Sequence, residues 1–176
     1  TPEIDGVVSS YFEWMGAGSF EVVPAAGATM HQVSVREPGL RAIEFGFDLE
    51  HLYVRIDGTQ PMHELLAGFD VTLKFLHPAG VTLAIGADAH TVQLAVVDGD
   101  YKDRPLPLDC SGLRAVAGRV LEFQIPFRCL GVATHEPVAF FVGVNRGGNE
   151  VERHPRHRPI ELEVPDTDFI SKNWTA

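Results

Sequence analysis

Apolar and polar side chains alternate along most of this chain, and this period of two restricts its fold more than any other feature. The alternation is clearest in residues 41–48 and 52–57. Successive side chains of a β-strand point to opposite faces of its sheet, so the pattern predicts antiparallel strands that bury one face. The same pattern predicts further strands at 30–36, 69–77, 81–86, 91–97, 120–126 and 160–164.

Helical signals are few, which indicates an all-β fold. Residues 60–68 and 9–15 each predict only about one or two helical turns. Residues 137–145 are apolar on both faces, as expected of a central strand covered on both sides. About ten short strands of this kind form either two packed sheets or a partly closed barrel, and we expect an antiparallel β-sandwich.

The length of 176 residues is that of one domain, so we expect residues 1–176 to fold as a single unit. Residues 99–112 are rich in Pro, Asp and Gly and predict a long loop within it. The sequence opens without an initiator Met or a targeting segment, so we expect a domain excised from a longer protein. The compartment is not indicated, with the cytoplasm preferred. Cys110 and Cys129 have no zinc-site spacing and are expected to be buried free thiols.

The charge balance narrows the classes of partner. The chain carries 14 Lys and Arg against 24 Asp and Glu, a net charge of -10, which repels nucleic acid and anionic lipid. No apolar run approaches the roughly 18 residues that cross a bilayer. We therefore expect no nucleic-acid partner and no membrane partner. A neutral ligand such as a sugar, or a neutral protein surface, is compatible with this charge.

The most specific string lies within residues 4–18 and reads Tyr-Phe-Glu-Trp-Met-Gly-Ala-Gly at 11–18. It resembles a Tyr-Phe-Glu-Trp-x-Gly-Ala-Gly segment in the C-terminal region of bacterial glycoside hydrolase family 57 proteins, which are large α-glucan-processing enzymes. Residues 152–155 and 158–165, followed by the pairs Asp168-Phe169 and Asn173-Trp174, resemble the end of the same region. The resemblance implies a β-sandwich accessory domain, similar to family 9 carbohydrate-binding modules and other DOMON-like domains, that is carried behind a catalytic barrel.

The aromatic residues of that string have two interpretations. In the functional one, Trp14 stacks on a sugar ring, Glu13 accepts hydrogen bonds from hydroxyls, and Trp174 clamps the sugar from the other terminus. In the structural one, which we favour, the segment plugs one end of the sandwich or packs on the catalytic domain. We expect residues 4–18 to pack their aromatic side chains against the strands.

A second candidate site lies on the polar face of strand 52–57. Tyr53 is opposite in phase to the core residues of this strand, which predicts an outward ring on a rigid support beside Arg55 and Asp57. We predict that any glucan affinity depends on Tyr53 and Arg55, with Trp14 as the next candidate. The alternative is that these are ordinary solvent-facing positions. Further polar positions on predicted strands are Lys74, Glu122 and Gln124.

No cofactor is expected, although two weaker alternatives exist. Asp98, Asp100 and Asp103 have the oxygen ligands that calcium takes, but a solvated turn explains them better. None of the eight histidines has the spacing of a zinc site. The pairs Met30-His31 and Met62-His63 suggest haem, because some DOMON-like domains hold haem through a Met and a His.

The sequence contains no nucleophile elbow, P-loop or dinucleotide fingerprint, so we expect no catalysis by this domain alone. The expected function is that of a non-catalytic accessory module of an α-glucan-processing glycoside hydrolase. Such a module either binds carbohydrate or buttresses the catalytic domain. The alternative function is a haem-binding, DOMON-like electron-transfer domain.

Overall fold

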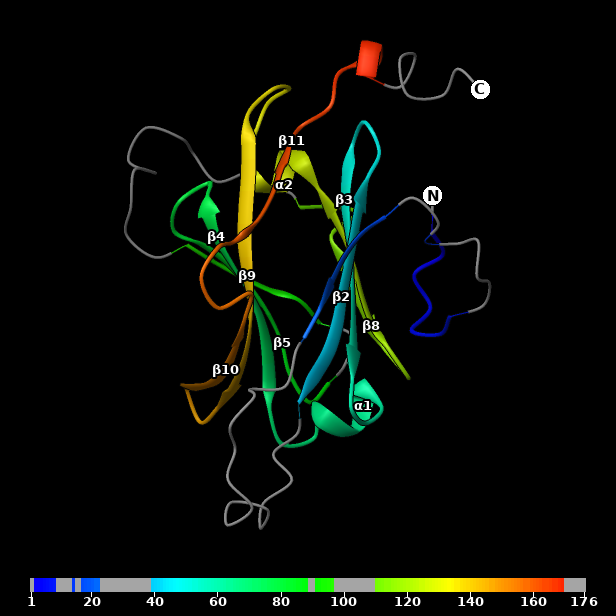
Figure 1. The fold of residues 1–176 in the computed structure, drawn as a ribbon, viewed down its shortest axis with the longest axis vertical. Helices are drawn as coiled ribbons and strands as arrows, with labels where there is room; N and C mark the ends of the chain where they lie inside the picture. The colour runs from blue at the N-terminus through cyan, green and yellow to red at the C-terminus, as the bar shows by residue number, and fades with distance from the viewer. Residues whose placement is uncertain are drawn as a thin grey trace.

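A computed structural model describes residues 2–8, 14, 17–22, 39–88, 91–96 and 110–169. Two antiparallel sheets pack against each other (Figure 1), which confirms the predicted all-β sandwich. Sheet A consists, in spatial order, of β1 (Gly18–Glu21), β2 (Leu40–Phe47), β3 (His51–Gly58), β8 (Leu121–Pro126) and β7 (Arg114–Ala117). Sheet B consists, in spatial order, of β10 (Asn149–His154), β9 (Pro137–Arg146), β4 (Asp70–His77), β5 (Val81–Ile85) and β6 (Gln93–Val96). β11 (Ile160–Glu163) pairs with β9 as well.

The core lies between the sheets and follows the alternation of the sequence. Leu52, Val54 and Ile56 of β3 are fully buried on the inner face of sheet A. The antiparallel register sets them opposite equally buried residues of β8, namely Ile125, Phe123 and Leu121. Each buried side chain of this size stabilises the fold by about 1.5–3 kcal/mol. β9 is buried along most of both faces, as the prediction of a central strand requires.

Two short helices carry the chain from sheet A to sheet B. α1 (Met62–Leu65) follows β3, and α2 (Phe127–Leu130) follows β8. The predicted helix at 60–68 is therefore present, although only its middle is helical. None of the helices in the described part of the chain is long and apolar enough to span a membrane.

Three strands and one helix had no clear signal in the sequence: β1, β7, β10 and α2. β1 and β7 have only four residues each, and β10 is mostly polar. The predicted strand at 30–36, and nearly all of the predicted helix at 9–15 and loop at 99–112, lie outside the described residues. The predicted strand at 160–164 is confirmed as β11.

The N-terminal segment, residues 2–8, lies on the outer face of sheet A, where Figure 1 draws it in blue. The carboxylate Oε2 of Glu122 accepts the backbone N–H groups of Asp5 at 3.1 Å and Gly6 at 2.9 Å. The carbonyl of Gly6 accepts the N–H of Val120 at 3.2 Å. Gly6 has φ +77°, a conformation that favours glycine. Backbone hydrogen bonds thus fasten this segment across the end of β8.

Candidate functional site

Tyr53 faces away from the core, as predicted, but its ring is covered. Its exposed fraction is 3%, because it packs in a small cluster with Ile4 and Trp14. The Tyr53 hydroxyl donates to Asp48 Oδ2 at 2.7 Å. The expectation of an exposed aromatic platform at Tyr53 is therefore corrected: the N-terminal segment takes the place that a ligand would need.

Asp48 is stabilised as a carboxylate by this arrangement. Burial opposes its ionisation, but hydrogen bonds from Tyr53 and from the backbone N–H groups of Glu50 and His51 outweigh burial and lower the pKa of Asp48. Asp48 also begins the turn between β2 and β3. The Tyr53 hydroxyl consequently serves the hairpin and is engaged within the protein.

Arg55 and Asp57 form a fixed ion pair further along the same strand. Arg55 donates from Nε and Nη2 to the two carboxylate oxygens of Asp57, both at 2.8 Å, and from Nη1 to Glu44 at 3.2 Å. Both side chains of the pair are mostly buried, with exposed fractions of 11% and 12%. Burial alone would lower the pKa of Arg55, but the hydrogen bond and charge of Asp57 raise it further above its ordinary value.

This pair lines a cavity of about 650 Å³, the polar cavity, at the end of β3. The exposed residues Val7 and Val8 form one wall. Of the predicted sugar-binding residues, the structure therefore brings Arg55 and Asp57 to a cavity and leaves Tyr53 outside it. The other polar residues of the lining are Arg41, Thr59, Gln60 and Arg119.

Trp14 is buried, with an exposed fraction of 9%, and packs in the cluster with Ile4 and Tyr53. Its indole Nε1 is buried and has no hydrogen-bond partner among the described residues. For Trp14, these observations favour the structural interpretation, in which its ring packs against the strands, over stacking on a sugar. Glu13 and Trp174 lie outside the described residues.

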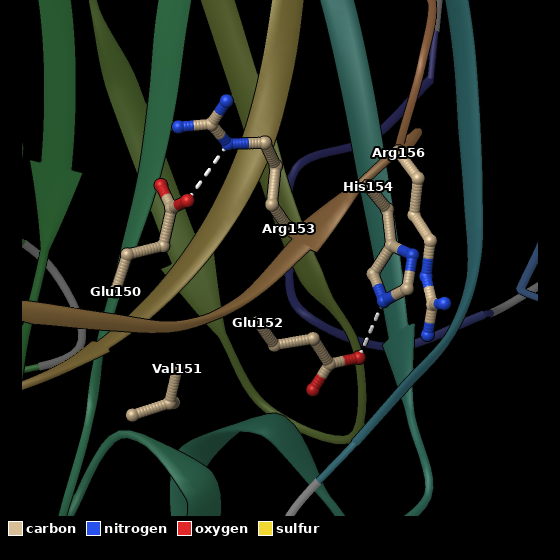
Figure 2. Close-up of a pocket in the computed structure, with 6 residues that line it drawn as sticks. All are labelled: Glu150, Val151, Glu152, Arg153, His154 and Arg156. Atoms are coloured by element: carbon tan, nitrogen blue, oxygen red, sulfur yellow. Dashed lines mark hydrogen bonds and ion pairs between the residues drawn. The ribbon is translucent and has the colours of Figure 1, made fainter. Parts of the chain in front are cut away.

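A charged cluster on β10 lines a pocket of about 320 Å³ (Figure 2). His154 Nε2 lies 2.6 Å from Glu152 Oε1, which also accepts the N–H of Leu40 at 3.0 Å. The His154 ring packs near Phe20 of β1, with ring centroids 6.3 Å apart. These contacts join an edge of sheet B to an edge of sheet A, so the cluster has a structural explanation.

Glu150 in the same cluster bonds to two cations. Lys74, a polar position noted in the sequence, lies 3.0 Å from Glu150, and Arg153 lies 2.7 Å from it (Figure 2 shows the Arg153 contact). Burial raises the pKa of Glu150, but the hydrogen bonds from Lys74 and Arg153 outweigh burial and lower it. Gln124 is also engaged, because its amide donates to the carbonyl of Gly112 at 3.4 Å. These side chains are therefore engaged within the protein.

The side chains of Met62 and His63 are not arranged to hold a haem together. Met62 is fully buried in the core, whereas the side chain of His63 is about half exposed and bonds to the Gly118 carbonyl at 2.9 Å. The two side chains thus do not face one site. The Met30-His31 pair and the acidic loop of Asp98, Asp100 and Asp103 lie outside the described residues. Within the described ranges, no group of three or more His, Cys, Asp or Glu side chains could hold a metal ion.

A different pocket combines aromatic rings with carboxylates. This aromatic pocket, of about 390 Å³, lies between β2 and the segment from β11 to Phe169. Its apolar wall includes Phe45, Phe47, Leu162 and Phe169, and its polar rim consists of His135, Glu161, Glu163 and Asp166. Phe169 has an exposed fraction of 45%, and its ring centroid lies 5.6 Å from that of Phe47.

The aromatic pocket is held by strands on two sides. Phe45 and Phe47 follow the inward phase of β2 and stay half-buried at the end of the sandwich. Phe45 has room because its strand partner is Gly18: a Cβ atom there would lie 2.4 Å from the Phe45 ring. Glu161 and Glu163 follow the outward phase of β11 and are exposed. Rings and carboxylates therefore stand on rigid supports.

Sequence reasoning missed this pocket. The alternation placed Phe45 and Phe47 on the inner face correctly, but an inward residue is expected to be buried, not to line a pocket. Glu161 and Glu163 were noted only as the polar face of a strand. No local pattern connects residues 45–47 with 161–169, because their proximity arises from the packing of two different sheets.

No model of a known protein family matches this chain, and no curated protein matches it significantly. The resemblance to the C-terminal region of family 57 glycoside hydrolases stays a prediction.

Proposed function

We propose that this domain is a non-catalytic carbohydrate-binding module, and that the aromatic pocket holds the sugar. The observation that carries the proposal is the half-exposed ring pair Phe47 and Phe169 beside the carboxylates of Glu161 and Glu163. The parent protein would be an α-glucan-processing glycoside hydrolase, as the resemblance at residues 11–18 suggests.

The chemistry of a glucan matches this combination. A glucose unit has a flat apolar face, which packs on aromatic rings, and a rim of hydroxyl groups, which donate to carboxylate oxygens. Among the residues that the structure describes, the polar rim of the aromatic pocket holds three carboxylates and one histidine and no Lys or Arg. Such a rim favours a neutral, hydroxyl-rich ligand over an anionic one.

Affinity electrophoresis in gels that contain glycogen tests the proposal. We expect the domain to be retarded, and Phe169→Ala to lose most of the retardation because the mutation removes the exposed ring. Leu76→Ala is the matched control, since Leu76 is an exposed apolar residue of β4, with an exposed fraction of 51%, that does not line the pocket. Equal retardation of the two variants would place the sugar elsewhere.

Two further outcomes decide between neighbouring hypotheses. Loss of retardation in Arg55→Ala, with the retardation of Phe169→Ala unchanged, would indicate that the sugar binds in the polar cavity instead. No retardation of the intact domain, by glycogen or by maltooligosaccharides in calorimetry, would overturn carbohydrate binding and favour the role of a buttress for the catalytic domain. We expect no turnover of an aryl glucoside by the domain alone.

A further inference from the structure

His135 stands at the rim of the aromatic pocket with a carboxylate at each ring nitrogen. Its Nδ1 lies 2.9 Å from Glu163 Oε1, and its Nε2 lies 3.2 Å from Asp166 Oδ2. A neutral imidazole has only one N–H group, so it can donate to one carboxylate at a time. Only the imidazolium form, with two N–H groups, satisfies both contacts.

Asp166 extends this contact to the aromatic wall. While its Oδ2 faces His135, its Oδ1 accepts the backbone N–H of Phe169 at 2.7 Å. The Phe169 ring in turn lies against Phe47, at 5.6 Å between centroids. A continuous series of contacts therefore runs from His135 through Asp166 to the ring pair.

The backbone of His135 is fixed, so its side chain can act as an anchor. Its N–H donates to the Val164 carbonyl at 2.8 Å, and the N–H of Val164 donates to the Glu136 carbonyl at 3.0 Å. His135 has φ +67°, a conformation that a residue with a side chain adopts only where its surroundings hold it.

We infer that His135 is a positioning residue, whose protonated ring holds Asp166 and thereby Phe169 in place, so that sugar binding weakens when the ring loses its proton. The inference depends on the proposed function, because it concerns the same pocket. On loss of the proton, one contact to a carboxylate is lost, and Glu163 and Asp166 no longer have a cation between them.

The charges around the imidazole act in one direction. Glu163 of β11 and Asp166 of the segment that follows it face the ring, and Glu161 lies on the same rim of the pocket. Glu136, next in sequence, directs its Oε2 to the N–H of Ala133 at 2.7 Å. The hydrogen bond to Glu163 is the largest influence on the pKa of His135, and together with the charges of Asp166 and Glu163 it outweighs desolvation and raises that pKa.

Calorimetry with maltohexaose between about pH 5.5 and about pH 9 tests the inference. We expect affinity to fall about two- to fivefold as the pH rises, the size of effect that an exposed ion pair supports. His135→Gln should bind at the weaker level throughout, with little pH dependence. His63→Gln, which changes a half-exposed histidine away from the pocket, should keep the pH dependence of the original protein.

A measurement without sugar separates the two proposals. In nuclear magnetic resonance spectra of the intact domain, the cross-relaxation between the rings of Phe47 and Phe169 should weaken as the His135 ring titrates. Weakening of this signal in a domain that binds no sugar at any pH would support the positioning role and overturn the proposed function. A ring contact and a sugar affinity that both stay constant as His135 titrates would overturn the positioning role alone.

Discussion

Tyr53 on the outer face of sheet A and Phe47 at the end of β2 each have an aromatic neighbour and a carboxylate close by, but solvent reaches them differently. Tyr53 is covered by Ile4 and Trp14 and bonds to Asp48. Phe47 packs against the core on one side and against Phe169 on the other, and the Phe169 side chain is 45% exposed. The difference teaches that the residue types on a strand do not decide whether a ring can bind a ligand. The segment that packs over the ring decides it.

The largest expected effect is on stability, and it tests this comparison directly. Tyr53→Ala should lower the free energy of unfolding by about 4 kcal/mol, because the mutation removes a buried ring and leaves a cavity beneath the N-terminal segment. Phe169→Ala should cost about 1 kcal/mol or less, since much of that ring is already in water. Urea unfolding measures both values. Similar losses in the two variants would contradict the distinction between a covered and an open ring.

The next largest loss of stability is expected where the N-terminal segment contacts sheet A. In Gly6→Ala, the new Cβ atom would lie 2.6 Å from the backbone nitrogen of Gly118, and the left-handed conformation of residue 6 would be strained. We expect a loss of about 3 kcal/mol, and increased exposure of Tyr53 to solvent.

Gly147→Ala is the matched control for this prediction. Gly147 also has positive φ, but its Cβ position has open space. Only the strain of the left-handed backbone conformation, about 1 kcal/mol, is therefore expected. Thermal unfolding of the two variants gives the difference. Equal losses would mean that the close approach of Gly6 to Gly118 does not contribute.

The smallest expected effect is on the pH dependence of stability, through Asp48, which bonds to the hydroxyl of the covered Tyr53 ring. The folded state lowers the pKa of Asp48, so its contribution to stability is fully present above the ordinary value of 3.8 and is lost as the pH falls through the folded value. Because Asp48 is partly exposed, we expect this contribution to be below about 1 kcal/mol. Urea midpoints between about pH 6 and about pH 2 measure it.

Tyr53→Phe keeps the ring and removes the hydroxyl that bonds to Asp48, so it should make the acid-induced loss smaller. An unchanged loss in this variant would assign the shift to the backbone N–H donors of Glu50 and His51 together with the charge of the His51 ring.

Individual strands show which parts of the fold the sequence pattern predicts and which it does not. β2, β3 and β9 were predicted within about two residues, because their inner and outer faces differ in polarity or because both faces are apolar. β10 has no such signal: its Glu150, Glu152 and Arg153 are stabilised by charged partners and by β9, not by an apolar face. A strand of this kind can be recognised only once its neighbours are known.

For the candidate site, strand alternation alone shows which side chains point away from the core, since the period of a strand is a local property of the backbone. It thereby placed Tyr53, Arg55 and Asp57 on one face. The burial of Tyr53 and the contact of Phe47 with Phe169 could not be read from this alternation, because both depend on segments distant in the chain. Their contacts are set by the packing of one sheet on the other and by the course of the termini, which no local pattern encodes.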